Sequence, residues 1–202
     1  MSPRLKSTLI DLALIAAFAA LVAVCAILPA INIAGPVPIT LQTFGVLLSG
    51  AVLGARRGLL AVSLYLLLGV AGLPIFANGA SGPGVFAGPS VGYLVGFPLA
   101  AFVCGLIIER LPRQRVATSI PLVFVVGLVS SALCIHTLGM AGMVWRIPTT
   151  WAGAFDIDKV FWIGDAIKNV LMAIVATSVH RAFPDLLNAK GVRDEVKEPV
   201  SG

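Results

Sequence analysis

The stretch VFWIGDAIKNVLMAIVATSVHR, from Val160 to Arg181, decides how this chain folds. It is apolar over about 22 residues, which make a helix of about 33 Å, and the hydrocarbon core of a bilayer is about 30 Å thick. The sequence therefore predicts a membrane-spanning helix over about residues 160–181. Within it, Asp165 and Lys168 place opposite charges three residues apart, on one helix face. Each charge costs about 2.5 to 3.5 kcal/mol at the centre of a membrane helix, so we expect the pair to serve either a binding site or a mutual ion pair.

The composition extends this prediction to the whole chain. Of its 202 residues, 58% are hydrophobic and 11% are charged, and the mean hydropathy is +1.01. So few charges cannot cover the surface of a soluble globule, and the long apolar runs lack the alternation of membrane strands. The sequence predicts an all-α integral membrane protein that folds as a single membrane domain over residues 1–202.

The apolar runs and the basic residues together predict a topology. Six runs favour a bundle of six transmembrane helices, at about residues 8–30, 40–54, 58–73, 92–108, 119–145 and 160–181. Basic residues gather in segments that join one end of these helices, whereas the other end would hold only Arg146 and Lys159. The positive-inside rule then places both termini in the cytoplasm. The net charge of +5 follows this pattern, so it indicates orientation in the cell membrane rather than nucleic-acid binding.

The segment 74–90 differs from an ordinary solvated loop. It carries no charge, is rich in glycine and proline, and contains Phe76 and Phe86. This composition favours a compact outward lid over apolar surface, with a fixed packing loop as the alternative. His136, in contrast, is a lone imidazole among apolar neighbours, and we interpret it as a core histidine.

Several polar residues converge on one predicted site. Gln42 lies just inside the second span and Tyr93 at the mouth of the fourth, so with Asp165 and Lys168 they predict a binding site for a small polar solute near the outer face. No Walker motif occurs, so coupling to ATP hydrolysis would need a partner. A self-sufficient secondary transporter of a vitamin-like solute remains an alternative, although no inverted repeat is evident. A membrane enzyme that uses Asp165 and His136 for proton transfer is a less favoured alternative.

No pattern predicts a catalytic centre, a cofactor or a metal site. The three cysteines lie singly in apolar runs, without the spacing of a metal site or a redox motif. We interpret them as buried structural thiols.

Four strings of residues carry a family resemblance. They are GPVPITLQTFGVLLSGAVLG (35–54), YLLLGVAGLPIFANG (65–79), GPSVGYLVGF (88–97) and GDAIKN (164–169). In this order they resemble the BioY family. The resemblance implies a six-helix S component of an energy-coupling-factor transporter, with biotin as the transported substrate and with a transmembrane T component and ABC-type ATPases as partners. It also implies biotin contacts by Asp165, Lys168 and Asn78, and by Gln42 and Tyr93.

The first span is rich in alanine, and the small-xxx-small spacing of residues such as Ala16 and Ala20 permits close approach of another helix. Packing within this chain is one interpretation of these alanines. The family resemblance implies the other, a docking face for the T component.

Overall fold

The computed structural model describes residues 3–30 and 36–187, and all of the regular structure in these ranges is helical. Gly35, the first residue of one quoted string, and the charged residues after 187 lie outside the described ranges. The long helices are α1 (Pro3–Ile27), α2 (Gln42–Leu53), α3 (Ala55–Val70), α4 (Val91–Arg110), α6 (Ile120–Ser130), α7 (Thr137–Arg146) and α8 (Trp151–Ala182). The shorter ones are η1 (Ala77–Gly79), η2 (Pro83–Ala87), α5 (Arg113–Thr118) and the π-helix η3 (Ser131–His136).

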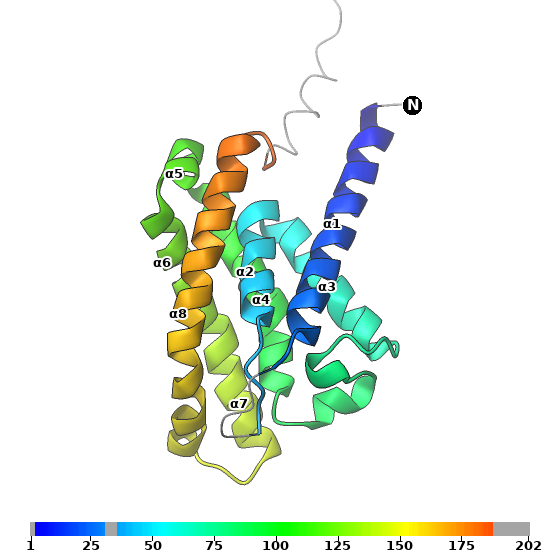
Figure 1. The fold of residues 1–202 in the computed structure, drawn as a ribbon, viewed down its shortest axis with the longest axis vertical. Coiled ribbons are helices and arrows are strands. Elements are labelled where there is room, and N and C mark those ends of the chain that lie inside the picture. Colours follow the sequence, from blue (N-terminus) through cyan, green and yellow to red (C-terminus); the bar gives the residue numbers. More distant parts are fainter. Residues whose placement is uncertain (1–2, 31–35, 188–202) are drawn as a thin grey trace, which may run out of the picture.

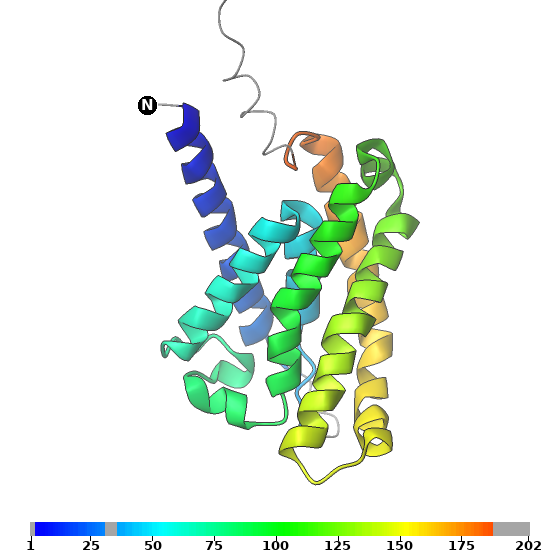
Figure 2. The same cartoon turned by 180° about the vertical axis from the view of Figure 1, so that it is seen from behind.

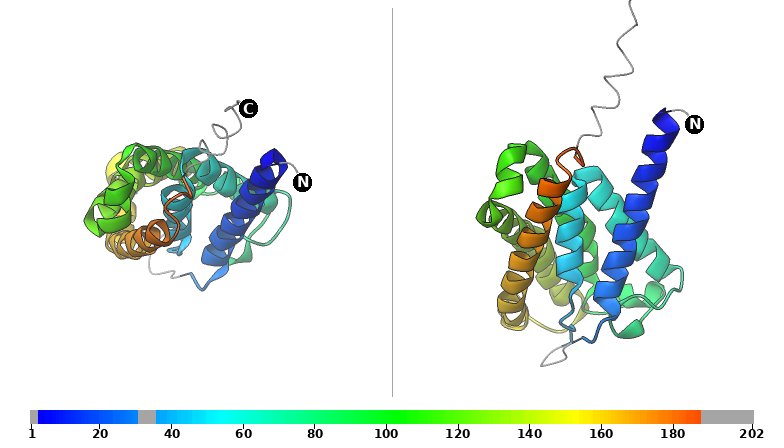
Figure 3. Two further views of the ribbon diagram at one scale, coloured as in Figure 1. Left: turned by 90° about the horizontal axis from the view of Figure 1, so that it is seen from above. Right: turned by 45° about the horizontal axis from the view of Figure 1, so that its top comes forward.

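The chain passes back and forth between two ends of a helical bundle. The start of α1, the short helix α5 and the end of α8 lie at one end, and the segments 36–41, 71–90 and 147–150 lie at the other (Figure 1). The reverse view shows α3 and α4 side by side (Figure 2), and these helices are in contact. Seen from above, α2 and α4 lie between the α1–α3 pair and the group formed by α5 to α8 (Figure 3).

Four helical stretches are long and apolar enough to cross a membrane. They are Leu5–Ile27, Val91–Arg110, Ile120–Arg146 and Trp151–Ala182, and the third runs through α6, η3 and α7. With 12 and 16 residues, α2 and α3 are shorter than the roughly 20 residues that a span normally needs. The prediction of an all-α protein with several membrane helices is confirmed. The count of six spans stays a prediction.

The last helix begins earlier than its apolar pattern indicates. It starts at Trp151 instead of about residue 160, because Thr150 has an extended backbone and its Oγ1 accepts a hydrogen bond from the Gly153 N–H at 3.2 Å. Hydropathy assigns the first turns to a loop because they contain charged residues. One of these, Lys159, pairs with Asp156 on the exposed side of α8 at 2.6 Å.

Glycines allow the helices around the site to approach closely. A β-carbon at Gly50 would overlap the backbone of Ala101, and one at Gly92 would overlap the backbone of Leu138. Contacts of this kind hold α2 against α4 and α4 against α7, as small residues do in membrane bundles. Gly139 lies directly against the Tyr93 ring and so leaves that side chain room to reach α8.

Candidate functional site

One face of α8 carries buried polar residues toward the centre of the bundle. Asp158, Asp165 and Lys168 lie there, and all three are buried although they are charged residues within an apolar helix. Between them, Ile163 and Ile167 are exposed on the opposite face. The spacing of three to four residues gives this helix one polar interior face and one apolar exterior face.

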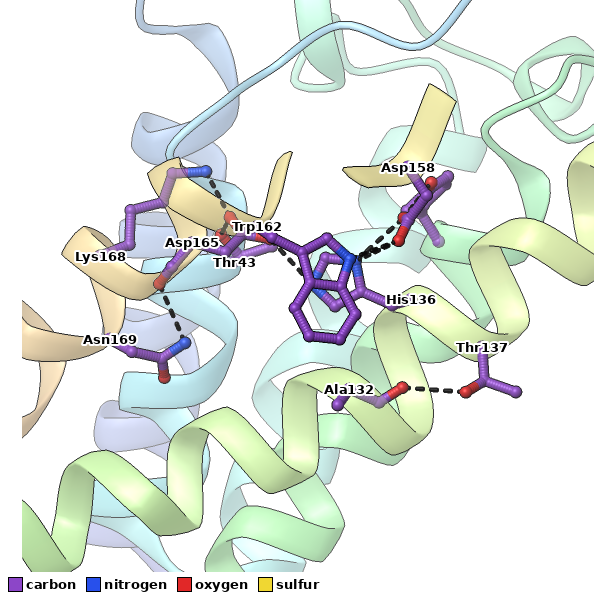
Figure 4. Close-up of polar contacts among 10 residues, drawn as sticks. Thr43, Ala132, His136, Thr137, Asp158, Trp162, Asp165, Lys168 and Asn169 are labelled. Atoms are coloured by element: carbon purple, nitrogen blue, oxygen red, sulfur yellow. Dashed lines mark hydrogen bonds and ion pairs between the residues drawn. The ribbon is translucent and has the colours of Figure 1, made fainter. Parts of the chain in front are cut away.

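The predicted pair, Asp165 and Lys168, forms a short ion pair. Lys168 Nζ donates a hydrogen bond to Asp165 Oδ1 at 2.6 Å, and the two side chains are only 10% and 4% exposed. Thr43 Oγ1, from the start of α2, donates to the same oxygen at 2.9 Å. The Asn169 amide donates to the backbone carbonyl of Asp165 (Figure 4). Two side-chain donors, one from another helix, therefore fix the orientation of this carboxylate.

His136 is buried, as the sequence predicts for a core histidine, and both of its ring nitrogens have polar partners. Its Nδ1 lies 2.9 Å from Asp158 Oδ1 and 3.0 Å from Oδ2, and its Nε2 lies 3.3 Å from Asp165 Oδ2 (Figure 4). The ring stacks on Trp162, with centroids 4.8 Å apart. His136 ends the π-helix η3, an element that often occurs at functional sites. These polar partners come from α8, so the local sequence around His136 does not reveal them.

A cavity of about 290 Å³ lies beside this network. Its size is near the lower end of the range for small-molecule sites, which is about 300 to 1,000 Å³. Apolar residues from several elements make up much of the wall, among them Phe76, Phe97 and Phe161. The five residues that the sequence nominates also line the cavity, so the structure brings them together around one space: Gln42, Asn78, Tyr93, Asp165 and Lys168.

Gln42 and Tyr93 each have a polar partner within the protein. The Gln42 amide donates to Tyr65 Oη at 2.8 Å and its carbonyl accepts from Thr40 Oγ1 at 2.8 Å. The Tyr93 hydroxyl donates to Asp158 Oδ1 at 2.7 Å. Both residues therefore help to hold the wall of the cavity, and contact with a bound molecule would be an additional role.

The segment 74–90 supplies part of the lining of the cavity. It contains η1 and η2, and Phe76 is fully buried against Gly69 and edge-on to the Tyr65 ring. Phe86 packs on Phe76 but does not line the cavity. Of the two phenylalanines in this segment, only Phe76 lines the cavity. Movement of this segment stays a prediction.

Asn78 lies at the edge of the cavity in an unusual backbone conformation. Its φ is +58° and its ψ is 25°, and among the described residues it is the only one besides glycines with positive φ. Asparagine tolerates this left-handed region better than most residues, and such backbone strain often marks a ligand site. Its side chain is exposed and has no protein partner in the described ranges.

Asp158 and Thr43 belong to the hydrogen-bond network, although the sequence analysis does not predict a role for either. Asp158 lies outside the predicted spans, yet it precedes Asp165 by about two helical turns on the same face of α8, and that spacing is the signal that the sequence offers. Thr43 gave no such signal, because its bond to Asp165 joins helices 122 positions apart in the chain.

The chain is similar to known proteins over most of its length. The model of the BioY family matches residues 1–185 of the chain. A biotin transporter BioY from Rhodobacter capsulatus is 39% identical over 191 residues, covering 90% of this chain and 98% of that protein. A biotin transporter BioY from Rhizobium etli is 36% identical over 177 residues, covering 86% and 95% respectively.

One solved structure has a similar fold. It is a crystal structure of the S component for biotin from an ECF-type ABC transporter. The TM-score is 0.80 over 90% of this chain and 95% of that one, with 24% sequence identity.

Proposed function

The chain belongs to the BioY family, and on that premise we propose that it is a biotin-binding S component, the substrate-capture subunit of an energy-coupling-factor transporter. This assignment makes it a solute-binding subunit and not an enzyme. The observation that carries the proposal is the buried Asp165–Lys168 pair in the wall of a small, largely apolar cavity. A buried ion pair is a weak source of stability, so its place beside a cavity favours a role in binding.

We propose partners in the cavity wall for the ureido group and for the fused ring of biotin. It offers two ureido N–H donors, a ureido carbonyl, an apolar fused ring and a carboxylate. Asp165 can accept a ureido N–H and Lys168 can donate to the ureido oxygen, since a carboxylate only accepts and an ammonium only donates. We place the ureido head at this pair because its two groups share one helix face, and we place the fused ring against aromatic residues such as Phe76 and Phe161.

The hydrogen bonds of the pair leave capacity for a ligand. Lys168 has three N–H donors, and in the described part of the chain one of them bonds to Asp165. Asp165 Oδ1 already accepts from Lys168 and Thr43, whereas Oδ2, among the residues that the structure describes, contacts only His136. Asn78, with an amide that has no protein partner in those ranges, supplies a further polar group at the mouth.

Calorimetric titration of the detergent-purified chain tests this function and the orientation. Biotin is expected to bind with a stoichiometry of one. An analogue that lacks the ureido carbonyl should bind at least about tenfold more weakly, because Lys168 would lose its acceptor. Biotinamide, whose carboxylate is replaced by an amide, should bind nearly as well as biotin. No heat with biotin would refute the function, and a selective loss with biotinamide would reverse the orientation.

The same proposal includes a membrane topology and partners. Six passes through the cell membrane with cytoplasmic termini are supported by the shared end of α1 and α8 and by the basic residues near it. A T component and ABC-type ATPases would supply ATP-driven transport. The face of α1 that includes Ala13, Ala16, Ala17 and Ala20 is exposed, which supports docking of the T component there.

One observation favours a second candidate, a self-sufficient proton-coupled carrier. His136 contacts two buried carboxylates. Buried histidines and carboxylates in contact form the proton relays of membrane transporters. Liposomes that contain only this chain distinguish the two functions. Accumulation of biotin driven by a pH gradient would favour the carrier, and accumulation only with added T component and ATPases would favour the S component.

A further inference from the structure

The position of His136 between two carboxylates raises the question of where its protons lie. Each ring nitrogen faces a different acid, Nδ1 toward Asp158 and Nε2 toward Asp165 (Figure 4). A neutral imidazole has one N–H and one lone pair, so it can donate to only one of the two. The other nitrogen would then point a lone pair at a carboxylate oxygen.

The remaining partners of Asp158 show which form it takes. The Trp162 indole N–H, which can only donate, bonds to Asp158 Oδ2 at 2.8 Å, and the Tyr93 hydroxyl bonds to Oδ1 at 2.7 Å. His136 Nδ1 lies between the same two oxygens. All three contacts suit an ionised carboxylate that accepts, so the proton on Nδ1 belongs to His136.

The same reasoning applies to Asp165. Lys168 and Thr43 both donate to its Oδ1, and this charge-assisted arrangement favours the ionised acid. A proton is still needed between Asp165 Oδ2 and His136 Nε2, which are 3.3 Å apart. Imidazole is the stronger base of the two in water, which places this proton on Nε2.

The charge of the cluster supports the same assignment. The ionisable groups in contact with the histidine are Asp158 and Asp165 from α8. Tyr93 from α4 bonds to Asp158, and Lys168 bonds to Asp165. With a neutral histidine the buried cluster would carry one net negative charge. With an imidazolium the two positive and two negative charges balance, which lowers the cost of burial. The Trp162 ring stacked on the imidazole further favours a cation.

We propose that His136 is a positioning residue of the biotin site, held as an imidazolium between Asp158 and Asp165, and that its proton is required for tight binding. The inference rests on the proposed function. His136 restrains the Asp165 oxygen that is not engaged by Lys168, and Asp158 in turn restrains His136. Loss of the proton leaves that oxygen facing a lone pair and the cluster with a net negative charge, so the acceptor for a ureido N–H is no longer held in place.

The proton itself is measured without ligand. The chain contains two histidines, so the variant His180→Asn leaves His136 as the only one. NMR of this variant with isotope-labelled histidine is expected to show both ring nitrogens of His136 protonated at neutral pH. A neutral ring with one bare nitrogen would overturn the proposal. Because no ligand is needed, this result stands apart from any failure of biotin binding, which would instead refute the proposed function.

The pH dependence of biotin affinity tests the positioning role. In the wild type, Kd is expected to rise at least about tenfold once the NMR signal shows that His136 has lost its proton. His136→Gln should bind at least about tenfold more weakly at neutral pH and show no such step. Asp158→Asn should release the proton at a lower pH than the wild type, since one of its two anionic partners is gone. His180→Asn serves as the matched control and should keep the wild-type profile.

Two outcomes would contradict this role. One is equal biotin affinity on both sides of the His136 titration, in the wild type or in Asp158→Asn. The other is a His136→Gln variant that folds, binds biotin as the wild type does and keeps its pH step. If His136→Gln does not fold, the test is the biotin affinity of the wild-type chain, compared between pH values at which His136 is protonated and pH values at which it is not.

Discussion

Replacing Asp165 by asparagine separates the charge of this residue from its shape. The amide oxygen can still accept hydrogen bonds from Lys168 and Thr43, but the amide nitrogen takes the place of Oδ2 and cannot accept from His136. What disappears is the charge that strengthens these bonds and any bond to a ureido N–H. A hydrogen bond to a charged group contributes about 1.5 to 3 kcal/mol, which corresponds to a loss of biotin affinity of about 10- to 150-fold.

The chain provides a matched control on the same helix. Asp156 and Lys159 have the same spacing and the same 2.6 Å contact as Asp165 and Lys168, but their side chains are 66% and 57% exposed. An exposed pair contributes little because water and salt screen it. We therefore expect Asp156→Asn to leave biotin affinity unchanged within a factor of about two.

The assay is calorimetric titration with biotin, with thermal unfolding of each variant as a test of folding. Asp165→Asn leaves the Lys168 charge buried without a counter-ion, so its melting temperature should fall below that of Asp156→Asn. The cost of breaking a buried pair, about 3 to 5 kcal/mol, is an upper limit here because the amide still accepts. A folded Asp165→Asn with wild-type affinity would remove this residue from the site. An equal loss in Asp156→Asn would show that charge on α8, and not the local contact, controls binding.

Three further predictions concern the other parts of the molecule. Asn78→Gly keeps the left-handed backbone but removes the amide, so it should weaken biotin binding about fivefold with little change in melting temperature. Asn78→Ala should weaken binding and also lower the melting temperature. Calorimetric titration measures the affinity, and thermal unfolding measures the stability. Ala16→Trp should prevent co-purification with a T component and leave biotin binding intact. Ile163→Trp, on the exposed face of α8, is the control and should still co-purify. Unchanged co-purification of Ala16→Trp would place the docking face elsewhere. A cysteine at Ser81, with the native cysteines replaced, should lose thiol accessibility on addition of biotin, whereas one at Thr149 should not; equal labelling with and without biotin would make the segment 74–90 a fixed wall.

The membrane class, the helical span around Asp165 and the placement of Asp165 and Lys168 on one helix face were determined by the sequence alone. Hydropathy is a local property summed over a run of residues, and the i, i+3 spacing on a helix does not depend on what packs around it. Polar residues inside apolar runs are costly, so they indicate a site even before their partners are known. For this reason Gln42, Tyr93, Asp165 and Lys168 could be nominated without coordinates. Asn78 came from the family resemblance, because nothing in its local pattern distinguishes it from other loop residues.

Only the tertiary structure decided what these side chains contact. Tyr93 donates to Asp158, His136 lies between two acids, and Thr43 orients Asp165 across two helices. These pairings depend on how closely α2, α4, η3 and α8 approach, which glycine contacts and the π-helix determine. They also depend on the start of α8 at Trp151, where the cap at Thr150 outweighs the unfavourable hydropathy of the first turns. Contacts between distant segments follow from packing geometry, and a single sequence carries no local signal for them.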